Sequence, residues 1–254
     1  MHDSTENPDT LPQPSAQRAV LVLAYVVIVL LVDLLATWKV HFLIDWTWFN
    51  WHPNRLMRYY AETGAPVPGI VGLILNSPLR GFDGFKLLFW FCIPFCICFR
   101  SMDWPQFSFR GWKRIDYALL GGGLLIGALA ILLVALLPQL KAYYPSLAHL
   151  TLAQKQGTFF NLLIWNLCWL PGWEFLFRYF LLRPINATWP RFGWLWLPLL
   201  EGAYHLQKAP LEALGMLLFS IAATQWVLRR NNLLLPLLIH AAIEMGLIVF
   251  LLAV

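Results

Sequence analysis

Three pairs of ionisable residues interrupt long apolar stretches in the last third of this chain. The pairs are Glu174 and Arg178, Glu201 and His205, and His240 and Glu244. The members of each pair are four positions apart, so on a helix they project from one face and can contact each other. Carboxylates and imidazoles brought together from neighbouring helices are groups used in general acid–base catalysis. These pairs are therefore the first candidates for a functional site.

The composition is typical of a membrane protein. Of the 254 residues, 59% are hydrophobic and only 12% are charged, whereas a soluble domain contains about 25% charged residues. The net charge of +5 is spread over connecting segments. A dispersed positive charge suits contact with an anionic lipid surface. We therefore expect membrane lipids as partners and no nucleic acid.

The hydrophobic pattern predicts an all-α, polytopic transmembrane bundle of about seven membrane segments. A spanning helix needs about 20 mostly apolar residues, and only helices or closed barrels satisfy the backbone in lipid. The predicted segments are 19–38, 84–100, 117–138, 158–182, 192–207, 211–228 and 233–253.

The domain organisation is simple. Residues 1–17 are polar, acidic and contain proline, which predicts a disordered tail. Residues 18–254 are predicted to form a single transmembrane domain, in which 158–254 is the motif-bearing core. The long connection 39–83 contains several Trp, Pro and Gly. It is interpreted as an interfacial amphipathic segment plus a loop.

The basic residues predict how the protein is oriented in the membrane. The connections 100–114, 183–191 and 229–230 contain eight Lys and Arg, against three in the connections on the opposite side. The positive-inside rule then favours a cytoplasmic N-terminus and an external C-terminus. The protein is expected to be an integral, multi-pass membrane protein.

The depth of the candidate residues suggests a shared cavity. At 1.5 Å per residue from the nearest Arg on the predicted cytoplasmic side (Arg183, Arg230 and Arg191), Glu174 lies roughly 13 Å deep, His240 about 15 Å and His205 about 21 Å. All three depths fall inside a hydrocarbon core about 30 Å thick, and helix tilt would make them more equal. Ionisable residues inside membrane spans are rare, costly and usually functional. We therefore expect the three side chains to meet.

Each candidate also has a purely structural interpretation. Glu174 and Arg178 can form a buried salt bridge that only holds helices together. His205 can be a hydrogen-bonded packing residue, and Glu244 can serve to orient the ring of His240. Three such coincidences within one third of a chain are less economical than one site.

Two further acidic residues are better explained by local structure. Glu212 follows Pro210 at the predicted start of a helix, where a carboxylate interacts favourably with the helix dipole. Asp33 is an isolated acid near the end of the first apolar segment, and its side chain is expected to reach the membrane interface.

The order and spacing of the three pairs resemble the CAAX-protease and bacteriocin-processing (CPBP) family of intramembrane glutamic endopeptidases. The signatures of that family are EExxxR, FxxxH, and HxxxN or HxxxD. The corresponding stretches here are WEFLFR at 173–178, EGAYH at 201–205 and HAAIE at 240–244. The resemblance covers roughly 158–254 and implies a divergent member.

Three positions depart from the family pattern. Trp173 replaces the first Glu, Glu201 replaces the Phe, and Glu244 replaces the closing Asn or Asp. If the leading Glu is the obligatory base, this protein is inactive. Alternatively, Glu174 takes the role of the base, or Glu201 returns the missing carboxylate from another helix.

The stretch from 205 to 212 extends the resemblance. It follows an H-x-x-K-x-P-x-E pattern that is similar to some divergent members of the family. This pattern adds Lys208 and Glu212 to the supporting residues. The complete supporting set is Arg178, Glu201, Glu244, Lys208 and Glu212.

The resemblance implies peptide-bond hydrolysis without a metal ion. Water would be activated by Glu174 and His205, and His240 would stabilise the oxyanion. Zinc held by Glu174, His205 and His240 is the alternative, because two His and one carboxylate suit zinc with an open water position.

The sequence therefore predicts an intramembrane endopeptidase that cleaves a membrane-associated or lipid-modified protein near one end. Prenylated C-termini, leader peptides and C-terminal sorting helices are all compatible substrates. The alternative is a catalytically inactive membrane scaffold or binding protein of the same fold. Replacement of the paired Glu by Trp173 favours this alternative.

Overall fold

The computed structural model describes residues 16–37, 59–79 and 81–254. The predicted disordered tail, except for its last two residues, lies outside the described residues. The same holds for 39–58, the first part of the predicted interfacial segment. The regular elements of the described chain are helices, which confirms the all-α prediction.

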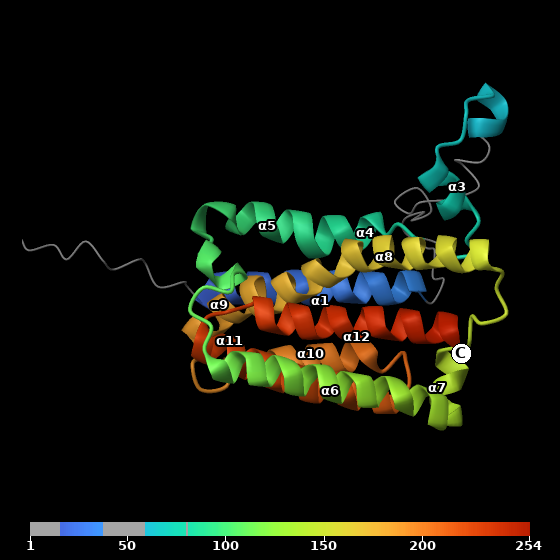
Figure 1. Ribbon diagram of the computed structural model, residues 1–254. Coiled ribbons are helices and arrows are strands. Elements are labelled where there is room, and N and C mark those ends of the chain that lie inside the picture. The colour runs from blue at the N-terminus through green and yellow to red at the C-terminus, as the bar shows by residue number, and fades with distance from the viewer. Residues whose placement is uncertain (1–15, 38–58, 80) are drawn as a thin grey trace, which may run out of the picture.

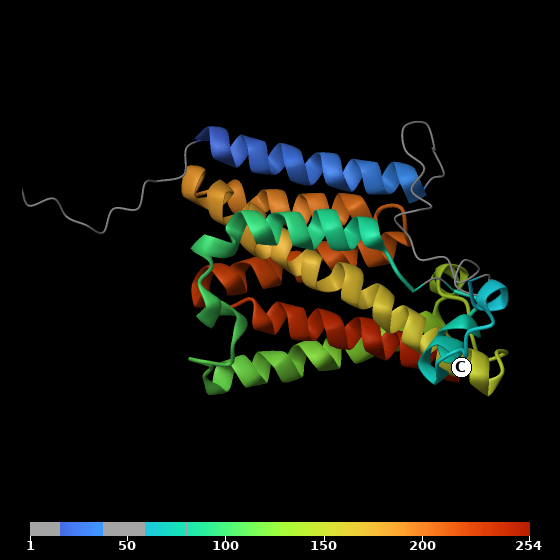
Figure 2. The same ribbon diagram turned by 90° about the horizontal axis from the view of Figure 1, so that it is seen from above.

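The long helices lie side by side and form an elongated bundle (Figures 1 and 2). They are α1 (Ala16–Thr37), α6 (Arg114–Leu136), α8 (Leu152–Phe175), α11 (Pro210–Arg230) and α12 (Leu234–Ala253). The shorter α-helices are α3 (Gly69–Leu75), α4 (Gly84–Lys86), α5 (Ile93–Cys98), α7 (Pro138–Tyr143), α9 (Leu182–Thr188) and α10 (Trp196–His205). The π and 3-10 turns are η2 (Leu87–Cys92), η3 (Phe99–Ser101), η4 (Trp104–Phe107), η5 (Leu176–Leu181) and η6 (Gly193–Leu195).

Each of the seven predicted segments corresponds to a helix or to a run of joined helices, but the predicted count of seven spans is not confirmed. Within the described residues, five helical stretches are long and apolar enough to cross a membrane. They are Ala16–Leu35, Gly84–Ser101, Arg114–Leu136, Pro210–Arg230 and Leu234–Ala253. The other two predicted segments fall on α8, which contains polar residues along its length, and on α10, which has only 10 residues.

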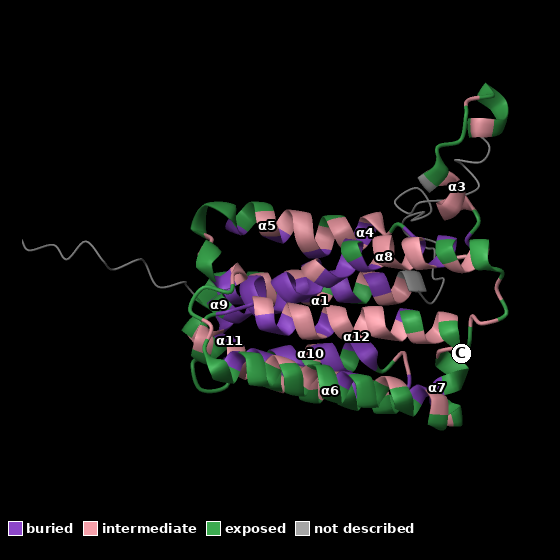
Figure 3. Ribbon diagram, in the orientation of Figure 1, coloured by how far each residue is buried: buried purple, intermediate pink, exposed green. Residues whose placement is uncertain are grey.

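The motif helix α8 starts at a capping box and continues without a break through η5 into α9. Thr151 accepts a hydrogen bond from the backbone N–H of Gln154, and the Gln154 side chain accepts one from the Thr151 backbone N–H. All six residues of η5 are buried. Figure 3 shows buried residues concentrated at this end of the α8–α9 helix and along α10. The core therefore surrounds the stretch that carries Glu174 and Arg178.

Small residues on α6 allow a close approach of α12, the helix that carries His240. A Cβ atom added to Gly123 would lie 2.6 Å from Ile239, and one added to Gly127 would lie 2.5 Å from Ile243. Such small residues at a helix–helix interface let two membrane helices pack tightly. The glycines of α6 thus fix the position of α12 against the bundle.

An aromatic cluster fills the space between α8, α10 and η2. Trp173 is 1% exposed, and its ring contacts Trp90, Phe177, Tyr204 and His205 at centroid distances between 4.6 and 5.5 Å. Aromatic pairs at such distances are stabilising beyond the area they bury. Trp173, one of the three residues that depart from the family pattern, therefore lies within the hydrophobic core.

The prediction for Asp33 is wrong. Its side chain is buried, accepts a hydrogen bond from the hydroxyl of Tyr204, and lies 3.3 Å from the Nζ of Lys86. Lys86 also contacts Asp83 at 3.0 Å. The partners come from α10 and from the α4 region, so the pairing was not visible in the α1 sequence. Through these contacts Asp33 holds α1 against the core of the bundle.

Candidate active site

The structure joins two of the three predicted catalytic residues directly. The Nδ1 of His240 on α12 lies 2.7 Å from the Oε1 of Glu174 on α8, and both side chains are almost fully buried. An ionised carboxylate can only accept, so the imidazole Nδ1–H is the donor and its Nε2 stays available. The predicted meeting of α8 and α12 through these residues is thus observed.

Aromatic rings hold the imidazole of His240 in place. Trp169 and Phe219 contact it edge-on, at centroid distances of 5.5 and 5.4 Å. Trp169 comes from α8 and Phe219 from α11, so three helices determine the ring orientation. A histidine fixed by a carboxylate and by packing has a defined tautomer and direction.

The second carboxylate oxygen of Glu174, Oε2, faces Arg178 instead of His240. Its Oε2 lies 3.8 Å from the Nε of Arg178, within ion-pair range but too far for a direct hydrogen bond. Both atoms are buried and lack a hydrogen-bond partner within the described part of the chain. Buried polar atoms without partners are uncommon and costly. Glu174 thus has one bonded oxygen and one oxygen that faces a guanidinium without a bond.

The main partner of Arg178 is Glu201. Both terminal nitrogens of the guanidinium donate to the Glu201 carboxylate, which is 0% exposed. The same carboxylate accepts from Trp173 Nε1 at 3.0 Å and from Ser220 Oγ at 2.7 Å. Glu201 therefore receives four hydrogen bonds from three helical elements, and both of its oxygens are occupied.

The expected pairing of Glu174 with Arg178 is thus the weaker of two contacts. Arg178 lies in η5, where the helix follows an i→i+5 hydrogen-bond pattern instead of the α-helical one. The wider turn changes the relative direction of residues four apart, and Glu174 and Arg178 stay within ion-pair range without a direct hydrogen bond. π-helical turns inside α-helices occur frequently at functional sites.

His205 lies at the C-terminal end of α10, next to Trp173. Its Nδ1 lies 2.8 Å from the backbone oxygen of Glu201, one turn earlier on α10, and its ring contacts Trp173 at a centroid distance of 5.5 Å. Since a carbonyl oxygen only accepts, Nδ1 carries the proton and Nε2 is the free acceptor of the neutral ring. No hydrogen bond joins His205 to Glu174 or His240 among the described residues.

Lys208 and Glu212 form a separate cluster near the start of α11. Lys208 Nζ lies 2.7 Å from a Glu212 oxygen, and the hydroxyl of Tyr144 donates to the other oxygen. Burial and the adjacent Glu212 carboxylate raise the pKa of the Tyr144 phenol, so this hydroxyl remains a donor. Glu212 therefore bonds the segment after α7 and the turn that precedes its own helix.

Glu244 does not orient His240, which is held by Glu174 instead. Within the described residues the Glu244 side chain forms no hydrogen bond or ion pair, and it is partly buried on α12.

The zinc alternative also lacks support from geometry. Among the residues the structure describes, no group of three or more His, Cys, Asp or Glu side chains is arranged to hold a metal ion.

The sequence interpretation missed Ser220 and the partner role of Trp173. Ser220 is 0% exposed and donates to Glu201 from α11. A buried serine in an apolar helix is a weak signal, because its hydroxyl can bond its own backbone. The motif pattern indicates only the loss of a carboxylate at Trp173, whereas its indole N–H donates to the carboxylate of Glu201.

Comparison with known proteins agrees with the motifs. A family model described as type II CAAX prenyl endopeptidase Rce1-like matches residues 155–246. No curated protein and no solved structure matches the chain. The matched stretch runs from α8 into α12 and contains all eight predicted site residues. The resemblance inferred from the three motifs is confirmed.

Proposed function

Because residues 155–246 form an Rce1-like segment in an integral membrane protein, we propose that this protein is an intramembrane endopeptidase. Its substrate is a membrane-associated or lipid-modified protein, cleaved near one end. The observation that carries the proposal is the buried Glu174–His240 pair at 2.7 Å, which joins two motifs 66 residues apart in sequence.

In this proposal Glu174 is the general base. Its Oε2 and the Nε of Arg178 are 3.8 Å apart and both lack a hydrogen bond among the described residues. When two polar atoms are separated by more than about 3.5 Å, a bridging water is the natural connection. The water that attacks the peptide carbonyl binds there, donates to Glu174 and transfers its proton to the carboxylate.

His240 and His205 have different roles in this proposal. His240 has its Nε2 directed away from Glu174 and, when protonated there, donates a hydrogen bond to the oxyanion. His205 has a free Nε2 that accepts from a water or from the substrate amide. A carboxylate and two aromatic rings hold His240 in place.

Glu201 is an anchor for Arg178 rather than a second base. Its four hydrogen bonds occupy both oxygens, so it has no oxygen left to accept a proton from water. The Glu201 carboxylate neutralises the charge of Arg178. Glu174 therefore faces the guanidinium without a direct hydrogen bond to it. Trp173 thereby supports the site from the position where the family has a carboxylate.

The decisive experiment replaces Glu174 with Gln and, separately, with Ala, and measures product formation from a C-terminally tagged membrane substrate. Loss of a general base lowers the rate by about 10²–10⁴-fold. Both variants are expected to lose product formation while remaining inserted and folded.

Glu62→Gln is the matched control, because this residue is exposed and lies outside the matched residues 155–246. It should retain full activity. A protein that tolerates both Glu174 variants, or whose wild type forms no product from any membrane substrate, is a scaffold or binding protein of this fold. Metal analysis of the purified protein, together with activity after chelation, tests the zinc alternative.

A further inference from the structure

An open groove lies beside α1 at the end of the bundle that the sequence predicts to be cytoplasmic. Figure 1 shows the start of α1, the end of α5 and the short helix α9 together at this end. Residues of α1, of α5 and η3, and of η5 and α9 line the groove, which we name the α1–α9 groove. Its volume is about 710 Å³, within the range of roughly 300–1,000 Å³ that is typical of ligand sites.

Most of the α1–α9 groove is apolar. Leu21 and Ile97 in its lining are 63% and 59% exposed, whereas Phe180 is 5% exposed. Tyr25 contributes its ring, because its hydroxyl donates to a backbone oxygen of η2 at 2.6 Å and its ring packs against Phe180. Tyr25 follows Arg18 by seven residues of α1, which is about 10 Å of helical rise. This length of apolar surface suits a hydrocarbon chain that lies along the helix.

Two exposed arginines line the same groove, Arg18 near the start of α1 and Arg183 near the start of α9. The guanidinium of Arg183 lies over the ring of Tyr179, 3.9 Å from its centroid, and Nη1 donates to the Tyr179 hydroxyl at 2.8 Å. These contacts position the guanidinium without neutralising it, because a phenol ring carries no charge. Among the described residues no Asp or Glu lines the groove, so its lining carries a net positive charge.

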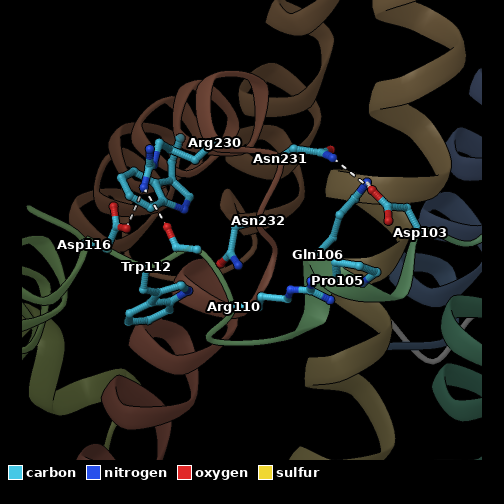
Figure 4. A pocket seen from close by; sticks show the side chains of 11 residues that line it. Asp103, Pro105, Gln106, Arg110, Trp112, Asp116, Arg230, Asn231 and Asn232 are labelled. Atoms are coloured by element: carbon cyan, nitrogen blue, oxygen red, sulfur yellow. Dashed lines mark hydrogen bonds and ion pairs between the residues drawn. The ribbon is translucent and has the colours of Figure 1, made fainter. Parts of the chain in front are cut away.

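A second pocket at this end of the bundle shows the opposite arrangement of charge. It has a volume of about 190 Å³ and lies between the loop that leads into α6 and the turn that joins α11 to α12 (Figure 4). There Arg230 donates to Asp116 at 2.7 Å, and Asn231 donates to Asp103 at 3.0 Å. The carboxylates of that pocket are thus bonded within the protein, whereas the positive lining of the α1–α9 groove favours an anionic ligand.

A ligand that matches the whole groove combines a negative group with a hydrocarbon chain. A small free anion would leave the apolar surface uncovered, and an uncharged lipid would not neutralise the positive lining. Phosphate forms charge-assisted hydrogen bonds with a guanidinium, often in a bidentate geometry. Basic pockets between membrane helices on the cytoplasmic side bind anionic lipid headgroups in other proteins. The phosphate and acyl chain of a phospholipid supply both parts.

We propose that the α1–α9 groove is a binding site for an anionic phospholipid. The phosphate lies between Arg18 and Arg183, and an acyl chain follows α1 toward Tyr25. The site selects a lipid by its charge, which goes beyond the general contact that any membrane protein makes with lipid. Neither Glu174 nor His240 lines the groove, so this inference does not depend on the proposed endopeptidase function.

The test uses the full-length protein in an uncharged detergent and native mass spectrometry, which counts the lipids that stay bound to each protein molecule. The probes are phosphatidylglycerol and phosphatidylcholine with the same acyl chains. Both contain the phosphate, but only phosphatidylcholine carries a compensating cation. One arginine near an anionic lipid strengthens binding about fivefold, so two arginines should make phosphatidylglycerol bind about 5–30-fold more tightly.

Variants connect this preference to the α1–α9 groove. Arg18→Gln and Arg183→Gln are each expected to lower the preference for phosphatidylglycerol about fivefold, and the double variant should abolish it. Arg114→Gln and Arg191→Gln are matched controls, because these exposed arginines lie at the same end of the bundle and do not line the groove. Ala187→Trp places an indole in the groove at an exposed position without changing the charge, and it should remove most of the phosphatidylglycerol binding.

Equal binding of the two lipids, or a loss in the control variants as large as in Arg18→Gln and Arg183→Gln, overturns the proposal. Full binding by a folded Ala187→Trp protein also overturns it, because the lipid then lies outside the groove. Displacement of phosphatidylglycerol by inorganic phosphate, or by a lipid-modified peptide, assigns the groove to that ligand instead. Thermal unfolding verifies the folding of each variant. Selective lipid binding by a protein that cleaves no substrate retains this site and removes only the proposed protease function.

Discussion

Glu174 and Glu201 are two buried carboxylates that face the same guanidinium and are bonded in opposite ways. Glu201 accepts four hydrogen bonds and has no oxygen left. Glu174 accepts one, from His240, and its other oxygen faces Arg178 at 3.8 Å. A saturated carboxylate is stable but inert, whereas an unsaturated one retains the capacity to accept a proton. This difference in hydrogen bonding makes Glu201 a structural partner of Arg178 and leaves Glu174 as the candidate base.

The comparison also explains how the chain tolerates Trp173 in place of a carboxylate. The negative charge opposite Arg178 is supplied by α10, and the indole N–H at position 173 donates to it. Breaking a buried ion pair leaves an uncompensated charge, which is more costly than never having the pair. We therefore expect the two carboxylates to respond differently to substitution.

The largest expected effect is that of Glu201→Leu on stability. Removing this carboxylate leaves Arg178 buried without its main partner, which costs about 3–5 kcal/mol. Denaturation in detergent should show this loss, whereas Glu174→Gln should change the free energy of unfolding by about 1 kcal/mol. The double variant Arg178→Met with Glu201→Leu should recover only part of the lost stability, because it removes the guanidinium that faces Glu174. Equal destabilisation by Glu201→Leu and Glu174→Gln would contradict the distinction.

The next largest effect is expected for His240→Gln, which tests whether the Glu174–His240 pair takes part in catalysis. Replacing His240 with Gln removes the imidazole that bonds Glu174 and faces the proposed oxyanion. Removing one oxyanion donor lowers kcat about 10²–10³-fold. Turnover of a membrane substrate should fall by that factor with little change in thermal midpoint. Unchanged kcat in a folded His240→Gln protein would exclude the pair from the chemistry.

A smaller effect is expected from Trp173→Phe, which removes one of the four donors to Glu201. A hydrogen bond to a charged group contributes about 1.5–3 kcal/mol. Trp90→Phe is the matched control, because Trp90 is equally buried and its Nε1 has no partner within the described residues. Trp173→Phe should be more destabilising than Trp90→Phe, as measured by unfolding in detergent. The reverse order would show that packing, not the hydrogen bond, determines the cost.

The smallest effect is predicted for Lys208→Met. The Lys208–Glu212 ion pair is partly exposed, with 36% of the lysine side chain accessible. Such pairs contribute about 0–1 kcal/mol, and screening places this one at the lower end. Neither turnover nor unfolding should change measurably. A large loss of turnover would instead place Lys208 with the catalytic groups.

Much of the fold followed from local sequence patterns. Apolar runs located helices at each of the seven predicted segments, and the spacing of Glu174 and His240 within those runs indicated that they lie inside the bundle. The pattern did not distinguish spans from shorter buried helices such as α10, because hydrophobicity is the same for both. Nor did it reveal the π-helical turn at Arg178.

The sequence by itself determined that this is a helical membrane protein with buried acids and imidazoles in its last third, since hydrophobicity and residue spacing are local properties. Only the tertiary structure decided which groups pair. Arg178 bonds Glu201, Glu174 bonds His240, and Asp33 bonds Tyr204, each across different helices. These choices depend on helix rotation and close packing, which distant residues such as Gly123 and Gly127 impose.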